Sequence, residues 1–290
     1  MMQVLSTSGF ADYELLDSGH GRKLERYGAV IVDRPEPQAM WRPRQGPDAW
    51  QKAHARFVGQ DEDAGAWTTA PSCPKDWNLR VADATVECRL TSFRHLGIFP
   101  EQFPHWEFMV ERLRGHQGAR PKLLNLFGYT GVASLLAAAA GAEVVHIDAS
   151  KTAVAWARHN QALSNLGDRP IRWIVEDARK FVQREQRRGN VYNGILVDPP
   201  KFGRGPNGET WELFEHLPEM IGACANLLAP EQAFLVVTAY AIRMSAVSLD
   251  TLVREHLAAR GGIFSSGELA ITERGEGRPL VTSLFTRWHG

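Results

Sequence analysis

Apolar runs and helix-length segments alternate along the second half of the chain. From about Lys122, the stretches "KLLNLF", "EVVHIDA", "IRWIVED", "NGILVD" and "AFLVVTA" are nearly continuous in apolar residues. Between them lie "GVASLLAAAAG", "KTAVAWARHNQALSNLG", "ARKFVQREQRRG" and "ELFEHLPEMIGACANLLA", each long enough for a helix. This pattern predicts an α/β fold with a mostly parallel sheet that helices cover on both faces. The last stretch, "GELAITERGEGRPLVTSLFTRW", predicts a terminal antiparallel hairpin, because two extended runs flank a glycine-rich turn.

The first ninety or so residues have a different pattern of apolar and polar positions. Short alternating stretches such as "AVIVDRP" and "TVECRLTSF" are bounded by Gly, Pro and Asp, which predicts short antiparallel strands. The segment "RPEPQAMWRPRQGP" is typical of an extended connector. We therefore expect a small β-rich domain over residues 1–94 and a larger α/β domain over residues 95–290.

Composition mainly limits which partners, covalent links and cellular locations are expected. The 290 residues include 33 basic and 33 acidic side chains, and this neutrality neither favours nor excludes a nucleic-acid partner. The three cysteines, Cys73, Cys88 and Cys224, form no C-x-x-C pair, so neither disulfides nor a thiolate zinc site is expected. The first residues lack a basic segment followed by an apolar run, and the longest apolar stretch, Val132 to Gly141, is too short for a bilayer. We expect a soluble cytoplasmic protein with no membrane partner.

Ligands of an open parallel sheet bind beyond the carboxyl ends of its strands, and the first such end reads "LLNLFGYTG". Gly128 and Gly131 lie there between strand and helix, where a missing Cβ lets the backbone approach a ligand. A dinucleotide enzyme normally has three glycines as G-x-G-x-x-G, whereas this chain has only G-Y-T-G. The two glycines are equally compatible with a tight turn alone.

Three further strands end on carboxylates. Asp148 follows the glycine loop by about 20 residues, the spacing of an acid that binds ribose hydroxyls. The alternative is a helix cap, but Ser150 can cap the next helix and leave Asp148 for a ligand. Asp177 is compatible with binding an adenine amine or with capping a helix. Asp198 precedes two prolines that stop the strand and hold the chain open, so we expect a ligand in front of it.

This ordered series resembles the class I S-adenosylmethionine-dependent methyltransferases. "NLFGYTG" looks like their cofactor loop, "HIDAS" like the ribose-binding acid, "VEDARKF" like the adenine-binding acid and "DPPKF" like the catalytic motif. "LLNLFGYTG", "DPPKF" and the upstream "HLGIFPEQ" are similar to the bacterial large-subunit ribosomal RNA methyltransferases and their uncharacterised relatives. In those proteins a Phe/Tyr-Leu-Asp-Gln-type segment precedes the cofactor domain, and here Phe99, Pro100, Glu101 and Gln102 stand in its place. The resemblance covers about residues 95 to 290.

The resemblance implies a Rossmann-like class I methyltransferase sheet and the cofactor S-adenosyl-L-methionine, with no metal. It implies three sets of site residues. The cofactor set is Phe99, Gln102, Asn125, Phe127, Gly128, Tyr129, Thr130, Gly131, Asp148, Ala149, Ser150, Asp177, Ala178 and Asp198. The catalytic set is Asp198, Pro199, Pro200 and Phe202, and the substrate-binding set is Lys201, Tyr240 and Arg243. For Lys201 the alternative to a phosphate contact is solvent alone, which is slightly favoured. For Tyr240 and Arg243 the alternative is a packed ring and a solvated side chain.

The acceptor loop favours nitrogen over carbon as the methylated atom. A carboxylate at Asp198 and the Pro199 carbonyl can hold the N–H groups of a base, with Phe202 stacked on its ring. Carbon-5 methylation of cytosine needs a thiolate that adds to the ring, and position 201 is Lys. The stretch Thr238 to Tyr240 after the next strand also lacks a cysteine, and Cys224 lies within a predicted apolar helix.

The resemblance implies RNA as the substrate, with ribosomal RNA favoured. Candidate RNA contacts are "HGRKLERYG" and "WRPRQ" in the first domain, which would then serve substrate recognition, and Arg184, Arg187 and Arg188; a solvated surface explains them equally well. The alternatives for the whole chain are methylation of a protein amide or small molecule, and an RNA-binding protein that keeps the cofactor site without turnover. A nicotinamide oxidoreductase is disfavoured by the missing third glycine.

Overall fold

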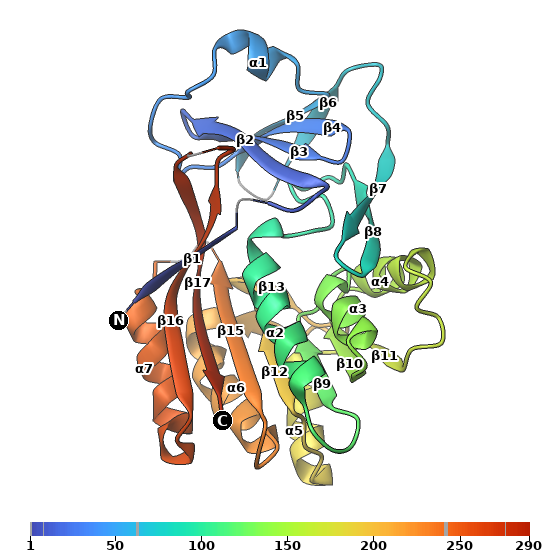
Figure 1. Cartoon of the computed structure of the whole chain (residues 1–290), viewed down its shortest axis with the longest axis vertical. Coiled ribbons are helices and arrows are strands. Elements are labelled where there is room, and N and C mark those ends of the chain that lie inside the picture. Colours follow the sequence, from blue (N-terminus) through green and yellow to red (C-terminus); the bar gives the residue numbers. More distant parts are fainter. Residues whose placement is uncertain (1, 8, 62–63, 241–242, 276) are drawn as a thin grey trace. The chain divides into compact units, whose positions relative to one another are not determined.

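A computed structural model describes residues 2–7, 9–61, 64–240, 243–275 and 277–290 of the chain (Figure 1). The chain forms two compact units. The first comprises Met1–Leu5, His105–Leu269 and Ser283–Gly290, and the second comprises Ser6–Pro104 and Ala270–Thr282. The second unit is thus completed by residues from near the end of the chain. The predicted boundary between a domain over residues 1–94 and a methyltransferase domain over residues 95–290 stays a prediction.

An eight-stranded sheet forms the centre of the first unit, with the order β1–β16–β17–β15–β12–β9–β10–β11. The pairs β9–β10, β10–β11, β9–β12 and β12–β15 are parallel, and β15–β17 is antiparallel. The predicted mostly parallel sheet and terminal hairpin are confirmed, whereas the edge strand β1 was not expected. The strands are β1 (Gln3–Thr7), β9 (Lys122–Leu126), β10 (Glu143–Asp148), β11 (Ile171–Val175), β12 (Gly194–Val197), β15 (Phe234–Tyr240), β16 (Ile263–Thr272) and β17 (Pro279–His289).

Helices cover both faces of this sheet (Figure 1). On one face, α5, α6 and α7 share an apolar core with strand residues such as Leu124, Leu126 and Val197. On the other face, α2 packs its Phe108 against Phe234, and α3 and α4 contact β9, β10 and β11. The helices are α2 (Phe103–Gly115), α3 (Val132–Ala139), α4 (Lys151–Leu163), α5 (Ala178–Arg188), α6 (Leu213–Leu227), α7 (Ala246–Leu257) and the 3-10 turn η2 (Ala258–Arg260).

The strand order reverses between β9 and β12, since the chain runs from β9 outward through β10 and β11 and then restarts at β12. Such a switch point is where open α/β sheets bind ligands. The register pairs Leu126 with both Ile147 and Val197. Phe127 after β9, Asp198 after β12 and Asp148 as the last residue of β10 therefore lie at one level on three adjacent strands. Two strand spacings, about 10 Å, separate the two aspartates.

Short strands dominate the second unit. A five-stranded sheet has the order β2–β3–β4–β5–β6, and β7 pairs with β8. The predicted antiparallel pairs are present, but β4 and β5 pair in parallel across the connector. The elements are β2 (Tyr13–Gly19), β3 (Arg22–Tyr27), β4 (Val30–Pro35), α1 (Pro47–Gln51), β5 (Ala55–Asp61), β6 (Ala64–Thr69), β7 (Asp76–Val81), β8 (Ala84–Arg89) and the 3-10 turn η1 (Pro100–Gln102).

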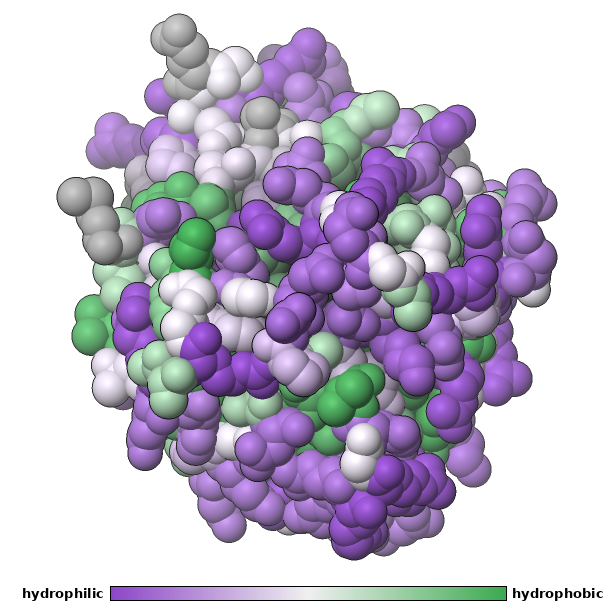
Figure 2. Space-filling model, turned by 60° about the horizontal axis from the view of Figure 1, so that its bottom comes forward, coloured by the Kyte–Doolittle hydropathy of each residue, from purple (hydrophilic) through white to green (hydrophobic). Residues whose placement is uncertain are grey.

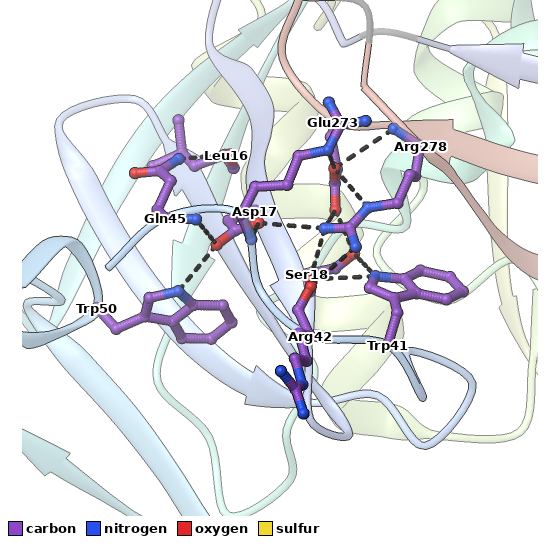
Figure 3. A network of polar contacts seen from close by, with 10 residues as sticks. Leu16, Asp17, Ser18, Trp41, Arg42, Gln45, Trp50, Glu273 and Arg278 are labelled. Carbon is purple, nitrogen blue, oxygen red and sulfur yellow. Dashed lines mark hydrogen bonds and ion pairs between the residues drawn. The ribbon is translucent and has the colours of Figure 1, made fainter. Parts of the chain in front are cut away.

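The connector after β4 is fixed by Asp17, a buried carboxylate of β2 (Figure 3). Asp17 accepts hydrogen bonds from the backbone N–H groups of Arg44 and Gln45 at 3.0 and 2.9 Å, and from the Trp50 indole at 3.0 Å. A buried carboxylate requires such donors. The extended connector expected from the sequence is therefore an ordered part of this unit.

The terminal hairpin joins the same network through Glu273 and Arg278 (Figure 3). Glu273 accepts hydrogen bonds from the Ser18 hydroxyl at 2.6 Å and from Arg278 at 2.9 Å. The Arg278 guanidinium also lies over the Trp41 ring at 5.3 Å. Residues separated by more than two hundred positions in the chain thus share one set of polar contacts.

A second buried group of charges surrounds Glu25 of β3. Its carboxylate accepts hydrogen bonds from the hydroxyls of Tyr13 and Tyr27 and from the guanidinium of Arg34, at 2.8 to 3.1 Å. Burial alone would raise the pKa of Glu25, but Arg34 and Lys23 hold it below its ordinary value. A pair of this kind is retained only when each charge is compensated, as it is here.

The face drawn in Figure 2 is mostly hydrophilic, with apolar side chains in small separate groups. Single exposed apolar residues are normal on protein surfaces. In the part of the chain that the structure describes, no helix is long and apolar enough to cross a membrane.

Candidate functional site

The loop after β9 has an unusual backbone. Phe127 and Tyr129 both have positive φ, at 57° and 51°, and Gly131 has φ of 84°. Positive φ costs a non-glycine residue about 1–2 kcal/mol. Backbone conformations of this kind are concentrated at ligand-binding sites, where the surrounding structure maintains them.

Packing explains why two positions of this loop are glycines. A Cβ on Gly128 would lie 2.4 Å from the His146 ring, and one on Gly131 would lie 2.9 Å from both Ala157 and Trp173. Gly131 also occupies the left-handed region at the start of α3. Both glycines let the loop lie directly on neighbouring side chains, and this requirement exists independently of a ligand.

A buried polar cluster supports the loop from below. Asn125 on β9 and His146 on β10 are paired across the sheet, and both are buried. Ser134 of α3 links them, since its hydroxyl is 2.9 Å from the Asn125 amide and 3.0 Å from His146 Nδ1. Burial lowers the pKa of His146 to about 3, so the ring is neutral at ordinary pH. Asn125 therefore supports the loop through Ser134, a contact that its predicted place in the cofactor set did not anticipate.

Asp148, at the end of β10, accepts hydrogen bonds from two backbone segments of the site. Its Oδ2 accepts a hydrogen bond from the Tyr129 N–H and its Oδ1 accepts one from the Ser150 N–H, both at 2.8 Å. Burial raises the pKa of Asp148, and the two backbone hydrogen bonds offset only part of that rise. The carboxylate thus ties the glycine loop to the turn before α4.

The next two predicted site residues cap helices. The Ser150 hydroxyl accepts a hydrogen bond from the Ala153 N–H at 3.2 Å at the start of α4. Asp177 caps α5 in the same way, with its Oδ1 accepting from the Lys180 N–H at 3.0 Å. Capping by Ser150 matches the expectation that it leaves Asp148 for another partner. The helix cap uses Oδ1, one of the two carboxylate oxygens of Asp177.

Ser150→Ala should lower the free energy of unfolding by about 1 kcal/mol, because an unpaired N–H at the start of α4 loses its acceptor. Thermal unfolding followed by circular dichroism measures the change. Ser150→Asp is the matched control, since a carboxylate caps a helix equally well and is favoured by the helix dipole. Equal stability of the alanine and aspartate variants would contradict the capping role.

The Asp198-Pro199-Pro200 segment leads into a small hairpin that the sequence did not predict. Phe202–Arg204 (β13) pairs with Thr210–Glu212 (β14). The backbone N–H of Leu213 donates to the Lys201 carbonyl at 3.0 Å. The segment after the prolines is therefore an anchored hairpin rather than an open loop.

Two side chains of this segment face solvent. Phe202 is 61% exposed, which leaves its ring accessible for stacking. Lys201 is also exposed, and its ammonium lies 5.3 Å from the centre of the Phe202 ring. An exposed aromatic ring beside a cation is a suitable contact for a nucleobase next to a phosphate.

The remaining predicted residues lie at other places. Tyr240 ends β15 opposite Ser283 and is half-buried, and Arg243 is exposed beyond it. Phe99 precedes η1 and accepts a hydrogen bond from the Gln102 N–H at 3.0 Å. Phe99 and Gln102 belong to the second unit, so their contribution to the cofactor site stays a prediction.

Several basic residues considered for RNA contact form ion pairs within the protein. On α5, Arg184 pairs with Glu176 and Arg188 pairs with Glu185 at 3.2 Å, whereas Arg187 is exposed. Charges already paired contribute less to phosphate binding, so Arg187 is the strongest of the three candidates.

The basic segments of the second unit show the same behaviour. Arg22 pairs with Asp33 at 2.5 Å and Arg26 pairs with Glu14 at 3.5 Å. Lys23 is buried and lies 3.3 Å from a carboxylate oxygen of Glu36. These contacts support a structural role for "HGRKLERYG". The expected RNA contact of this segment stays a prediction.

Cys224 belongs to α6 of the first unit, and Cys73 and Cys88 belong to the second unit. Cys224 is fully buried in α6 among apolar side chains, as expected, and burial raises the pKa of its thiol to about 12. Cys88 is buried in β8 of the second unit, and burial also raises the pKa of the partly exposed Cys73. A thiol with a raised pKa is a poor nucleophile at neutral pH.

A solved SAM-dependent methyltransferase from Agrobacterium tumefaciens superposes on this structure with a TM-score of 0.96. It is 51% identical in sequence, and the match covers 99% of this chain and 93% of that chain. The chain belongs to the SAM-dependent methyltransferases. The resemblance and fold predicted from the sequence are thereby confirmed, and the cofactor of this methyltransferase is S-adenosylmethionine.

Curated relatives of this methyltransferase carry the name ribosomal RNA large subunit methyltransferase K/L. The protein from Shewanella frigidimarina is 32% identical over 149 residues, which are 51% of this chain and 20% of that protein. The protein from Syntrophotalea carbinolica is 31% identical over 186 residues, which are 63% of this chain and 25% of that protein. The chain thus spans about a fifth to a quarter of the length of these relatives. No family model matches it.

The residues of the site fit the methyltransferase cofactor. A carboxylate offers about four lone-pair positions. On Asp148 two of these accept the Tyr129 and Ser150 N–H groups, which leaves acceptors for ribose hydroxyls. Ala178, the first residue of α5, directly follows Asp177, so a carboxylate and a backbone N–H stand next to each other in the chain. Among the described residues, no group of three His, Cys, Asp or Glu side chains is placed to hold a metal ion.

Four residues at the site were not among the residues predicted from the sequence: Ser134, His146, Trp211 and His216. Ser134 and His146 carried a usable signal, since each is a polar residue within an apolar helix or strand and must find a buried partner. Trp211 and His216 lie more than ten residues beyond the Asp-Pro-Pro motif, and only the pairing of β13 with β14 places Trp211 beside it. His216 packs near Trp211, at 5.7 Å between ring centres.

Proposed function

We propose that this methyltransferase transfers the methyl group of S-adenosylmethionine to a nitrogen of an RNA base, with ribosomal RNA the favoured substrate. The observation that carries the proposal is the position of Asp198. It follows β12 at the same level as Phe127 of the cofactor loop and Asp148, at the switch point of the sheet. An acceptor held by Asp198 would lie beside a cofactor held by Asp148.

The cofactor supplies a methyl group already activated on a sulfonium, so the protein has to bind, orient and exclude water. Asp148 accepts hydrogen bonds from the ribose hydroxyls. Asp177 and the Ala178 N–H bind the adenine edge, and the loop from Phe127 to Gly131 provides backbone contacts. Phe99 and Gln102, from the segment before the cofactor domain, complete this set.

The acceptor base is held by the segment after β12. Asp198 and the Pro199 carbonyl accept hydrogen bonds from N–H groups of the base, so that the nitrogen lone pair faces the methyl group. Phe202 stacks on the base, a contact worth about 1–3 kcal/mol. Lys201 contacts a neighbouring phosphate, and Tyr240 and Arg243 line the acceptor side.

RNA as the acceptor class is supported by the names of the curated relatives and by the exposed ring of Phe202 beside Lys201. The base must be single-stranded or flipped out to reach a strand end. Residues 1–94 then serve substrate recognition, and Arg187 offers a phosphate contact. We propose a cytoplasmic location, where such RNA is processed.

Transfer of tritiated methyl groups tests the proposal directly. Purified protein and labelled cofactor are incubated separately with ribosomal RNA, protein extract and a pool of small metabolites. Label is expected in ribosomal RNA, and mass spectrometry of its nucleosides should identify a base methylated on nitrogen. Label confined to protein or metabolites would refute the RNA proposal while preserving methyltransferase activity.

Cys224→Ala should retain turnover within about twofold, because the Cys224 thiol is buried and poorly nucleophilic. Initial rates of methyl transfer at saturating cofactor provide the measurement. A shift of the melting temperature by a few degrees is compatible with a lost packing contact. Loss of turnover in a folded variant, or detection of 5-methylcytosine in the product, would show that a cysteine attacks the base.

A further inference from the structure

Trp211 of β14 contacts both loops of the site. Its side chain is 3% exposed, and its indole N–H donates to the Pro200 carbonyl at 2.7 Å. The centre of its ring lies 4.9 Å from that of Phe127, which opens the cofactor loop. One side chain thus joins the acceptor segment after β12 to the cofactor loop after β9.

The Pro199-Pro200 pair limits how hydrogen bonds can hold the acceptor segment. Pro199 and Pro200 have no backbone N–H, so a hydrogen bond to this pair must use a carbonyl. The next attachment is the Lys201 carbonyl, which accepts from the Leu213 N–H at 3.0 Å. If the Pro199 carbonyl binds the acceptor, the Trp211 contact at Pro200 determines where that carbonyl lies.

The surroundings of Trp211 keep it in place. In the pairing of β13 with β14, Gly203 lies opposite Trp211. The centre of the His216 ring lies 5.7 Å from that of Trp211, and the two rings are tilted by 32°. His216 is itself fixed, because its Nδ1 accepts a hydrogen bond from the Glu212 N–H at 2.9 Å at the start of α6.

We infer that Trp211 is a positioning residue that sets the acceptor segment relative to the cofactor loop. This inference rests on the proposed function. In-line transfer is sensitive to placement, and a displacement of about 1 Å is able to cost about a hundredfold in rate. The indole N–H fixes the Pro200 carbonyl, and the indole ring transmits that position to Phe127.

Trp211→Phe separates the two contacts, because phenylalanine keeps an aromatic ring and lacks the N–H. We expect kcat to fall at least about tenfold, as the Pro200 carbonyl loses its indole donor and the segment shifts. The dissociation constant for S-adenosylmethionine, measured by calorimetry, should stay within about twofold. Without any cofactor or substrate, amide hydrogen exchange of residues 201–204 should become faster.

Trp288→Phe is the matched control. The Trp288 indole is equally buried in the first unit and donates to the Gly261 carbonyl at 2.8 Å, so the same chemical group is removed elsewhere. This variant should keep kcat and the exchange of residues 201–204. Trp211→Ala should in addition weaken cofactor binding, because the Phe127 contact is lost.

Equal kcat values for Trp211→Phe and the unchanged protein would overturn the inference. So would an equal loss of kcat in Trp288→Phe, because the effect would then follow stability alone. A protein that methylates no RNA at all would instead refute the proposed function. In that case unchanged hydrogen exchange in Trp211→Phe would still overturn the anchoring role, and faster exchange would support it.

Discussion

Asp198→Ala should lower methyl transfer by about 10²–10³-fold, a loss comparable with removal of one preorganised polar group from an active site. The alanine removes the carboxylate that we propose to hold the acceptor N–H beside the cofactor. The dissociation constant for S-adenosylmethionine should change little, because the proposed ribose contact lies two strand spacings away, at Asp148. Initial rates with ribosomal RNA and calorimetry with the cofactor measure the two quantities.

Asp198→Asn provides the matched control. Its amide keeps the size of the side chain and one acceptor oxygen, so we expect an intermediate rate. Asp250→Ala removes a carboxylate from α7 that pairs with Arg254 at 2.7 Å, and it should leave the rate unchanged. If Asp198→Ala binds cofactor far more weakly and turns over normally at saturation, Asp198 belongs to the cofactor site alone.

Asp148→Ala should have the second largest effect, on cofactor affinity. Hydrogen bonds to a charged group are worth about 1.5–3 kcal/mol each, so loss of the proposed ribose contact should weaken binding by about a hundredfold. The variant also removes the acceptor of the Tyr129 and Ser150 N–H groups, which destabilises the loop. Calorimetry with S-adenosylmethionine and S-adenosylhomocysteine measures the affinity.

At saturating cofactor, Asp148→Ala should recover a substantial part of kcat, which distinguishes it from Asp198→Ala. Asp250→Ala again serves as the control for folding and should bind cofactor normally. The reverse pattern, with Asp148→Ala affecting kcat alone and Asp198→Ala affecting affinity alone, would refute both assignments.

Asp148 also predicts a pH dependence. Burial raises its pKa, so it becomes protonated at a less acidic pH than an ordinary aspartate. Cofactor affinity should therefore fall as the pH drops from neutral into the mildly acidic range. The sign for folding is opposite, because a raised pKa means that the folded state holds the proton more tightly and gains stability as the pH falls. Protonation of Asp148 does not favour unfolding, so unfolding caused by this residue would not explain weaker cofactor binding at low pH.

The sequence predicted the large sheet because its strands are nearly continuous in apolar residues. Such runs must be buried on both faces, and that requirement is local and visible in one sequence. The acids Asp148, Asp177 and Asp198 were found in the same way, since each directly follows such a run. That Asp148 and Asp198 lie at one level across the sheet needed the register, which the structure supplied.

Contacts between distant parts of the chain were decided only by the tertiary structure. Glu273 and Arg278 complete the second unit beside Ser18 and Trp41, and no local pattern marks that return of the chain. Trp211 likewise meets Pro200 and Phe127 only because β14 folds back on β13.

Local periodicity thus determined the elements, the strand-end acids and, through their order, the resemblance to the methyltransferases. Hydrophobic burial acts on neighbouring residues, so it leaves a pattern along the chain. The buried supports, from Ser134 below the loop to Trp211 between the two loops, were decided by tertiary structure. A buried hydrogen bond requires a partner, but the sequence of one partner does not specify where along the chain the other lies.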